Sequence, residues 1–308
     1  MIRLAECTYP EAARLARDER AVVILPLGAV EQHGPHLPLL VDWLGAEELA
    51  RHVTPHLARA GYRVILAPSL PYGASPLAET WPGTVSLSRA TLGRVIVDVI
   101  GSLVRHGFRR FVLASYQADP AHVRAMADAK RALTRPRARR PGGRRLRIAF
   151  AGFSPEARSM AAMLDPRVLK LSRSPNPKGE WHSGELETAL VLARRPDLVR
   201  RAVARRLPPV WVDFRAALRR GAQRFEEIVP EGLGYFGWPA AARAVTAKRA
   251  LALRGRLMAA EIIRVLGPTG RAAPASRPLR ARVTPTGTRR SPRSARRATS
   301  RRGARRSP

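Results

Sequence analysis

Four short runs of apolar, largely β-branched residues constrain the fold of this chain more than any other feature. Each run is continuous rather than alternating, which is typical of a strand buried on both faces of a parallel sheet. The runs lie at Ala21–Pro26, Arg63–Ala67, Arg110–Ala114 and Leu146–Ala151. Segments with apolar residues at helical spacing separate them, at Asp42–Arg59, Leu92–His106 and Pro120–Leu133. The alternation predicts an α/β fold, in which a mostly parallel sheet is flanked by helices on both faces.

A mostly helical region is predicted beyond the sheet, over about Trp211–Gly267. It ends in a long helix at Pro239–Leu266, with room for one kink. No internal repeat is visible, and a body of residues 1–266 suits one large α/β domain or two small ones. Ligands of open parallel sheets bind beyond the carboxyl ends of the strands, so the loops that follow the apolar runs are where chemistry is expected.

Positive charge is concentrated in two segments. The 308 residues hold 56 Lys and Arg against 23 Asp and Glu, a formal net charge of +33. Residues 267–308 contain thirteen arginines, no acidic residue, no aromatic residue and no apolar period. Such a segment cannot bury enough surface to offset its chain entropy, so it is predicted to be a disordered Arg/Pro/Ser-rich tail. A second basic run, Lys130–Arg147, is predicted to be a surface loop that turns at Pro141-Gly142-Gly143.

The arginines of the tail are open to two interpretations. An Arg-rich arm can bind nucleic acid or another anionic surface through phosphate contacts. Alternatively, arginine accumulates by compositional drift in a GC-rich genome. Drift is favoured, because the tail offers no aromatic side chain on which a base could stack. A nucleic-acid partner is therefore not expected.

Composition also bears on the compartment. Cys7 is the only cysteine, so no intrachain disulfide can form and a reducing cytoplasm is the expected location. The longest clean apolar stretch, Ala21–Val30, falls well short of the ~20 residues that a membrane-spanning helix needs. The acidic N-terminal residues lack the layout of a signal peptide. Neither a membrane partner nor secretion is expected.

The loop after the first apolar run carries the clearest chemistry. Glu31 and His33 are two residues apart, so in an extended segment their side chains point the same way. Asp42 follows at the point where the next helix is predicted to begin, and an aspartate there can bridge two ions. Glutamate, histidine and aspartate together suit Zn²⁺, Mn²⁺ or Fe²⁺. The alternative for Asp42 is a helix N-cap in an ordinary polar loop.

Three motifs extend this pattern. They read EQHGPHLP at Glu31–Pro38 with Asp42 following, WPGTVSL at Trp81–Leu87, and WHSGELET at Trp181–Thr188. A turn at Gly234–Pro239 gives weaker support. In order and spacing the motifs resemble those of the creatininase family of metal-dependent amidohydrolases, over about residues 18–265 and without the tail.

The resemblance implies a creatininase-like α/β domain, often hexameric, with one or two divalent ions. Zinc is the first expectation, with manganese or iron as alternatives. Glu31, His33 and Asp42 would be ligands. His182 would act as acid and base beside the substrate, a role that suits a side chain titrating near neutrality. Glu185 is expected to be catalytic together with His182. Either Glu185 or Glu187 could also be a further ligand, or could support a ligand histidine by a hydrogen bond.

The third apolar run is followed by a departure from the family pattern. Ser115–Pro120 reads SYQADP, so Gln117 stands where the family places a ligand histidine. Asp119 stands where some members place a glutamate. Both residues are candidate ligands here, although a neutral amide oxygen binds zinc less well than imidazole does. Three outcomes stay open: an altered metal site, a site with one ion of two, or a homologue that binds or assembles without catalysis.

Taken together, these features predict a hydrolase. A metal-activated water would attack the carbon of an amide or cyclic amide C–N bond in a small molecule or a peptide precursor. A catalytically impaired homologue with a binding or assembly role is the alternative. Trp81 and Trp181 are candidates to line the substrate pocket or to pack in the core.

Overall fold

The computed structural model describes residues 1–135 and 145–269. The predicted turn at Pro141-Gly142-Gly143, and the predicted disordered tail apart from residues 267–269, lie outside these ranges.

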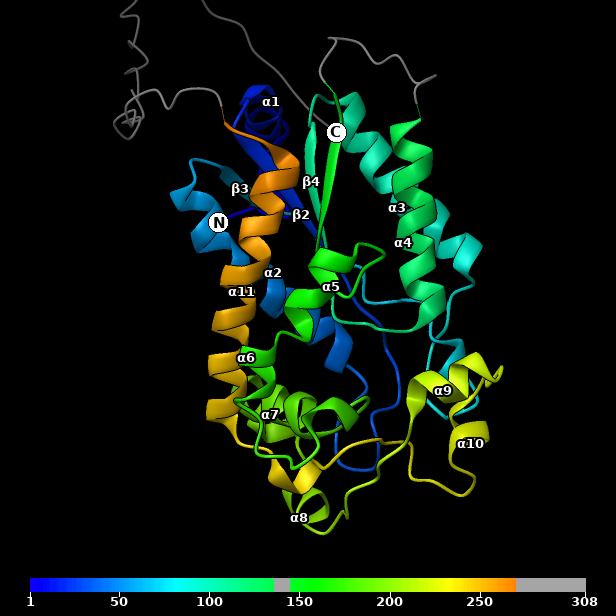
Figure 1. Cartoon of the computed structure of the whole chain (residues 1–308). Coiled ribbons are helices and arrows are strands. Elements are labelled where there is room, and N and C mark those ends of the chain that lie inside the picture. Colours follow the sequence, from blue (N-terminus) through cyan, green and yellow to red (C-terminus); the bar gives the residue numbers. More distant parts are fainter. Residues whose placement is uncertain (136–144, 270–308) are drawn as a thin grey trace, which may run out of the picture. The chain divides into compact units, whose positions relative to one another are not determined.

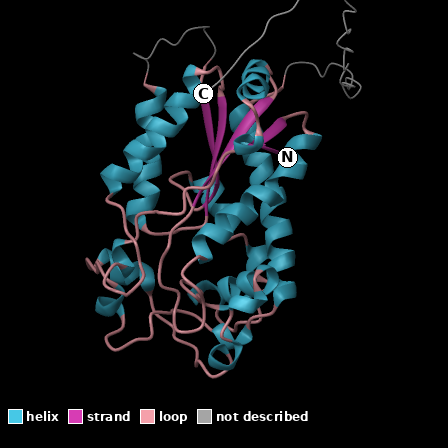
Figure 2. Ribbon diagram, turned by 180° about the vertical axis from the view of Figure 1, so that it is seen from behind, coloured by secondary structure: helices cyan, strands magenta, loops and turns pink. Residues whose placement is uncertain are grey.

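All four apolar runs form strands of one sheet, as predicted, and every neighbouring pair of strands is parallel (Figures 1 and 2). The strands are β1 (Ile2–Arg3), β2 (Ala21–Leu27), β3 (Arg63–Leu66), β4 (Arg110–Ser115) and β5 (Arg147–Gly152), in the order β1-β3-β2-β4-β5. The edge strand β1 was not predicted, because two residues are too few to show a period. The chain leaves β2 on one side, forms β3, and returns to the other side of β2 to form β4. Successive strands are thus added first on one side of β2 and then on the other, and the order reverses between β2 and β4. Open parallel sheets bind ligands at such a reversal point.

Helices cover both faces of the sheet, which confirms the predicted architecture. The longer helices are α1 (Tyr9–Arg17), α2 (Val41–Arg59), α3 (Arg89–Arg105), α4 (Pro120–Thr134) and α11 (Ala244–Leu266). One core packs α2 and α11 against Val22, Ile24 and Val112, and the other packs α1, α3 and α4 against Val23, Leu25 and Phe111. Successive strand residues thus enter opposite cores, which explains why the runs are apolar throughout.

Shorter helices and loops gather beyond the carboxyl ends of the strands (Figure 1). They are α5 (Ala157–Met163), α6 (Pro166–Leu169), α7 (Glu185–Arg194), α8 (Arg201–Ala204), α9 (Phe214–Arg219) and α10 (Phe225–Ile228). The predicted helix Pro239–Leu266 is divided, because a 3₁₀ turn at Pro239–Ala241 precedes extended Arg243 and the start of α11.

The packed chain continues slightly past the expected boundary at Leu266. The Tyr62 hydroxyl donates a hydrogen bond to the carbonyl of Gly267, and Thr269 Oγ1 donates to the carbonyl of Ala60 at 3.4 Å. Among the described residues, no helix combines the length and the apolar character needed to cross a bilayer.

Candidate metal centre

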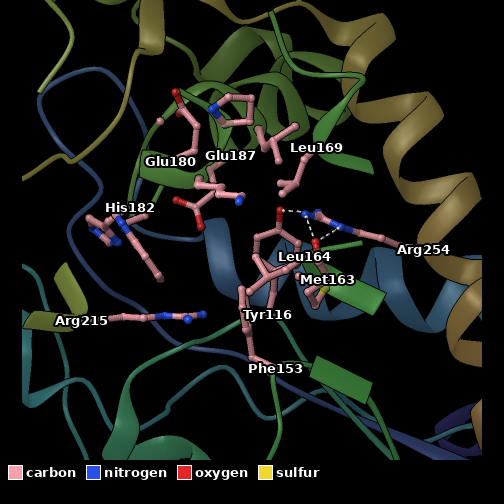
Figure 3. Close-up of a pocket in the computed structure, with 15 residues that line it drawn as sticks. Tyr116, Phe153, Met163, Leu164, Leu169, Glu180, His182, Glu187, Arg215 and Arg254 are labelled. Atoms are coloured by element: carbon pink, nitrogen blue, oxygen red, sulfur yellow. Dashed lines mark hydrogen bonds between the residues drawn. The ribbon is translucent and has the colours of Figure 1, made fainter. Parts of the chain in front are cut away.

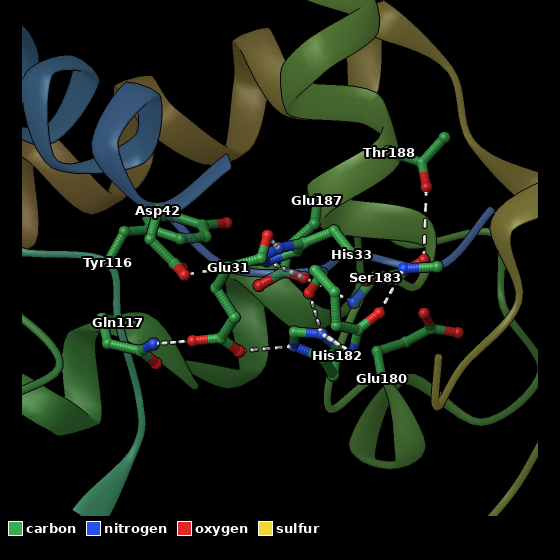
Figure 4. Close-up of polar contacts among 12 residues, drawn as sticks. Glu31, His33, Asp42, Tyr116, Gln117, Glu180, His182, Ser183, Glu187 and Thr188 are labelled. Carbon is green, nitrogen blue, oxygen red and sulfur yellow. Dashed lines mark hydrogen bonds and ion pairs between the residues drawn. The ribbon is translucent and has the colours of Figure 1, made fainter. Parts of the chain in front are cut away.

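The loop after β2 brings Glu31 and His33 to the reversal point of the sheet, and both side chains are buried (Figure 4). Backbone hydrogen bonds from Glu31 to Leu39 and from Val85 to Val30 hold this loop in place. Buried Asp42 lies in the first turn of α2, where the helix dipole favours an acidic side chain. The three acidic and histidine side chains of the first motif therefore lie together, on one side of the site.

His33 presents an unpaired ring nitrogen to two carboxylates. Its Nδ1 donates to the carbonyl of Glu31 at 3.0 Å, so Nε2 carries the lone pair. Nε2 lies 3.8 Å from Asp42 Oδ2 and 3.7 Å from Glu187 Oε2. Burial lowers the pKa of His33 to about 4, so the ring is neutral at neutral pH. His33 Nε2 and Asp42 Oδ2 are both buried without a hydrogen-bond partner.

His182 approaches the same cluster from the loop before α7. Its Nε2 donates to the carbonyl of Gln32 at 2.9 Å, which leaves Nδ1 facing Glu31 Oε1 at 3.8 Å. Its ring centroid lies 4.3 Å from that of His33. Burial, and then the nearby His33, lower the pKa of His182 well below its usual range. Ligand-capable atoms of His33, His182 and Glu187 all lie within 4.8 Å of one another.

The residue after His182 has an unusual backbone. Ser183 has a φ of 54°, in the left-handed region that a non-glycine residue rarely adopts. Its backbone N–H donates to Glu187 Oε2 at 2.6 Å, which fixes this carboxylate toward His33. Strain of this kind is often held at functional sites.

Three carboxylates share this buried space. Burial is the main cause that raises the pKa of Glu31, Asp42 and Glu187, and repulsion from neighbouring carboxylates adds to it at Glu31 and Asp42. Within the described parts of the chain, no lysine or arginine forms an ion pair with any of the three. Buried carboxylates are costly unless they are paired or bind metal. The unpaired atoms of His33 and Asp42 and the excess of negative charge fit a divalent cation.

The loop after β4 lies next to Glu31 but is occupied by its own hydrogen bonds. Gln117 Oε1 accepts the Asp119 backbone N–H at 2.9 Å, which turns the amide nitrogen toward Glu31 and Ser75. Gln117 Nε2 donates to Glu31 Oε2 and to Ser75 Oγ. This geometry does not support Gln117 as a ligand, because the side chain presents a donor, not an oxygen, to the site.

Asp119 acts as the N-cap of α4. Its Oδ1 accepts the Ala121 N–H at 2.7 Å, and its Oδ2 accepts the Leu77 N–H at 3.2 Å. Burial raises the pKa of Asp119 to about 6. Both oxygens of Asp119 thus have partners, whereas Asp42 Oδ2 has none. An N-cap was the alternative expectation for Asp42, but the N-cap of α2 is Leu40.

The two acidic residues at the start of α7 separate. Glu185 accepts backbone N–H groups of Arg173 and Ser174 at 2.8–2.9 Å, and its contacts lie in the preceding loop rather than in the cluster. Glu187 takes the position beside His33. The geometry therefore does not support Glu185 as a catalytic residue.

A cavity of about 340 Å³ adjoins the cluster, with His182 and Glu187 in its wall (Figure 3). Trp181 lines it, as one interpretation of the sequence allowed, whereas Trp81 does not. Arg215 and Arg254 also line it, and neither was singled out from the sequence. Arg254 could have been noticed, because it lies on the apolar face of α11 between Leu251 and Met258.

Known proteins resemble this chain over most of its length. It is 31% identical to creatinine amidohydrolase of Pseudomonas putida over 207 residues, which cover 64% of this chain and 73% of the relative. It is 29% identical to the mycofactocin precursor peptide peptidase of Mycobacterium ulcerans (strain Agy99), over 75% of this chain and 80% of the relative. A crystal structure of creatinine amidohydrolase (creatininase) matches with a TM-score of 0.67 and 26% identity, over 87% of this chain and 99% of that one.

The similar structures include a manganese form and a Zn-Zn form of creatininase. A manganese creatininase matches with a TM-score of 0.65 and 27% identity, over 87% of this chain and 99% of that one. A mutant creatininase of Zn-Zn type matches with the same score and identity, over 86% and 98%. The sequence model of the family described as "Creatininase: Creatinine amidohydrolase" matches residues 5–262. This chain belongs to the creatininase family, whose members are metal-dependent hydrolases of C–N bonds.

Proposed function

We propose that this protein hydrolyses a C–N bond of a small amide or a peptide precursor, the substrate types of its named relatives. The observation that carries the proposal is the cluster around His33. A buried imidazole nitrogen and a buried carboxylate oxygen face each other at 3.8 Å, and neither has a hydrogen-bond partner. A cation between these two groups would offset the cost of burying them without partners.

His33, Asp42 and Glu187 would hold the ion, with Glu31 at the edge of the same cluster. A divalent ion in this position supplies an activated water and polarises a carbonyl group. We propose a single ion, because Gln117 directs its amide N–H at Glu31 where a second ion would need an acceptor. Zinc as that ion, a homo-hexamer and a cytoplasmic location stay predictions.

His182 differs from His33 in lining the cavity. Its pKa is lowered by burial, so the ring is neutral near pH 7 and its Nδ1 can accept a proton. The hydrogen bond from Nε2 to the Gln32 carbonyl fixes the ring in this orientation. We assign His182 the transfer of a proton from the attacking water to the departing nitrogen, and His33 the binding of the ion.

The test separates these two roles. The purified protein is reconstituted with Zn²⁺ or Mn²⁺, its metal content is measured by elemental analysis, and hydrolysis of creatinine and of short peptides is assayed. We expect stoichiometric metal in the wild type and in His182→Ala, but at least about a hundredfold loss of hydrolytic rate in that variant, as is usual for a lost acid–base group. Metal loss in His182→Ala would make His182 a ligand. A loaded protein that hydrolyses no amide would favour the binding or assembly role.

A further inference from the structure

The wall of the cavity beside the candidate metal centre contains more cationic than acidic side chains. Besides His182 and Glu187, its wall contains three cationic side chains, which are Lys178, Arg215 and Arg254. The remaining carboxylate in the wall, Glu180, accepts the backbone N–H groups of Glu185 and Trp238. The inference drawn from these groups rests on the proposed function, because it concerns the substrate of the same site.

Arg254 is a buried cation without an ion pair. It is 4% exposed, its guanidinium donates to the Met163 carbonyl and the Tyr116 hydroxyl, and within the described ranges no carboxylate lies within 4.0 Å of it (Figure 3). A buried cation without a carboxylate partner favours an anion in the cavity.

Arg215 supplies a guanidinium that is free to bind. It projects from α9 into the cavity, stacked 5.3 Å from the ring of Trp181 (Figure 3). Across residues 1–135 and 145–269, the side chains of Arg215 and Lys178 make no hydrogen bond and no ion pair. A guanidinium oriented by an aromatic ring is well suited to bidentate binding of a carboxylate or a phosphate.

We propose that the substrate carries an anionic group, a carboxylate or a phosphate, and that Arg215 binds it while the scissile amide lies at the end of the cavity lined by His182 and Glu187. Lys178 and Arg254 add positive charge around the bound group. The apolar wall formed by Met163, Leu164 and Leu169 packs against the body of the substrate. Arg215 is thus a specificity-determining residue for an acidic amide.

The experiment compares matched probes in binding, so that turnover is not required. Titration calorimetry with the metal-loaded protein measures the affinity of N-acetylleucine against its uncharged amide N-acetylleucinamide, and of N-acetylethanolamine phosphate against uncharged N-acetylethanolamine. We expect at least one of the two anionic probes to bind about tenfold or more tightly than its neutral counterpart, and the larger of the two preferences identifies the group. In Arg215→Gln this preference should fall to about twofold or less, and Arg215→Lys should restore part of it.

Arg220→Gln is the matched control, because Arg220 is an exposed arginine at the end of the same helix and does not line the cavity. It should keep the wild-type preference. Equal affinity for charged and neutral probes would overturn the proposal. So would a preference that survives in Arg215→Gln, because the anion would then bind elsewhere, as on the ion itself. Hydrolysis of amides without an anionic preference would contradict this inference alone, whereas Arg215-dependent binding without any hydrolysis would contradict only the proposed function.

Discussion

Two halves of the candidate site contain similar residue types but differ in the hydrogen bonds that their side chains make. The β2–α7 half consists of His33, Asp42, His182 and Glu187, and it contains buried atoms that could bind a metal and have no hydrogen-bond partner. The β4 half consists of Gln117, Asp119 and His122, and all of its side-chain polar atoms have partners. Residue type alone therefore does not separate the two halves. The difference is that the β2–α7 half contains buried polar atoms without a protein partner, which is why the proposed ion is placed there.

Gln117 satisfies the polar groups of the β4 half. It links the carboxylate of Glu31 to Ser75 and to the backbone of Asp119. An amide can donate and accept at once, so this one side chain serves all three partners. Glu31 is in this way held from both sides, by Gln117 and opposite His182.

The largest contrast is expected in metal affinity. His33→Ala should weaken Zn²⁺ binding at least about a thousandfold, or about 4 kcal/mol, because it removes the imidazole from a buried ligand set. Gln117→Ala should change the affinity by no more than about threefold, because Gln117 presents a donor to the site. Competition with a chelator measures both. A comparable loss in Gln117→Ala would place the β4 loop among the ligands and remove the distinction between the halves.

Acid stability should show whether the fold holds His122, in the β4 half, in its neutral form. His122 is buried, its Nδ1 accepts the Ala74 N–H at 3.4 Å, and its Nε2 pairs with Ser115 Oγ at 3.3 Å. Burial lowers its pKa to about 4, below the value near 6.5 of an unfolded histidine. The unfolded chain therefore takes up a proton first, so the contribution of this residue is full above pH 6.5 and is lost as the pH falls toward 4.

We expect that His122 accounts for about 2 kcal/mol of the stability lost between pH 7 and pH 5 by the metal-free protein. Urea unfolding of wild type and His122→Gln at both pH values measures this contribution as the difference between their two losses. The same substitution at His106, an exposed residue at the end of α3, is the control. Equal acid sensitivity of His122→Gln and wild type would show that His122 is not held neutral by the fold.

The sequence was sufficient to predict the fold and the proximity of three candidate residues. The β-branched runs predicted β2 to β5, because a strand that is buried on both faces has apolar residues at every position. Glu31, His33 and Asp42 lie in one loop and the helix that follows it, so their proximity was readable from local spacing. Their assignment as ligands stays a prediction.

The rest of the site depends on contacts between distant segments. Glu185 and Glu187 lie two positions apart on a helix, and they therefore face different neighbours, which spacing alone does not identify. The orientation of Gln117 depends on the Asp119 N–H, and the cavity side chain of Arg215 comes from a six-residue helix without a strong pattern. These features follow from tertiary packing rather than from local propensity.

The smallest effect we predict is a gain in stability within the β2–α7 half. Asp42 is a buried carboxylate whose pKa is raised by burial and by Glu31 and Glu187, so without an ion its charge destabilises the fold. Asp42→Asn removes this charge at similar volume, and it gives up only part of a favourable helix-dipole interaction. The metal-free variant should be about 1 kcal/mol more stable than wild type, which raises the melting temperature by about 2–4 °C for a domain of this size.

The same substitution should cancel most of the stabilisation that the wild type gains from Zn²⁺, because the amide lacks the negative charge that attracts the ion. Asp197→Asn, at an exposed aspartate that pairs with Arg195, should leave the melting temperature unchanged. Differential scanning calorimetry with and without Zn²⁺ measures all of these values. A metal-free Asp42→Asn protein that melts below wild type would mean that Asp42 is already compensated by the fold. The β2–α7 half would then resemble the β4 half, and the unpaired oxygen of Asp42 would no longer indicate a bound ion.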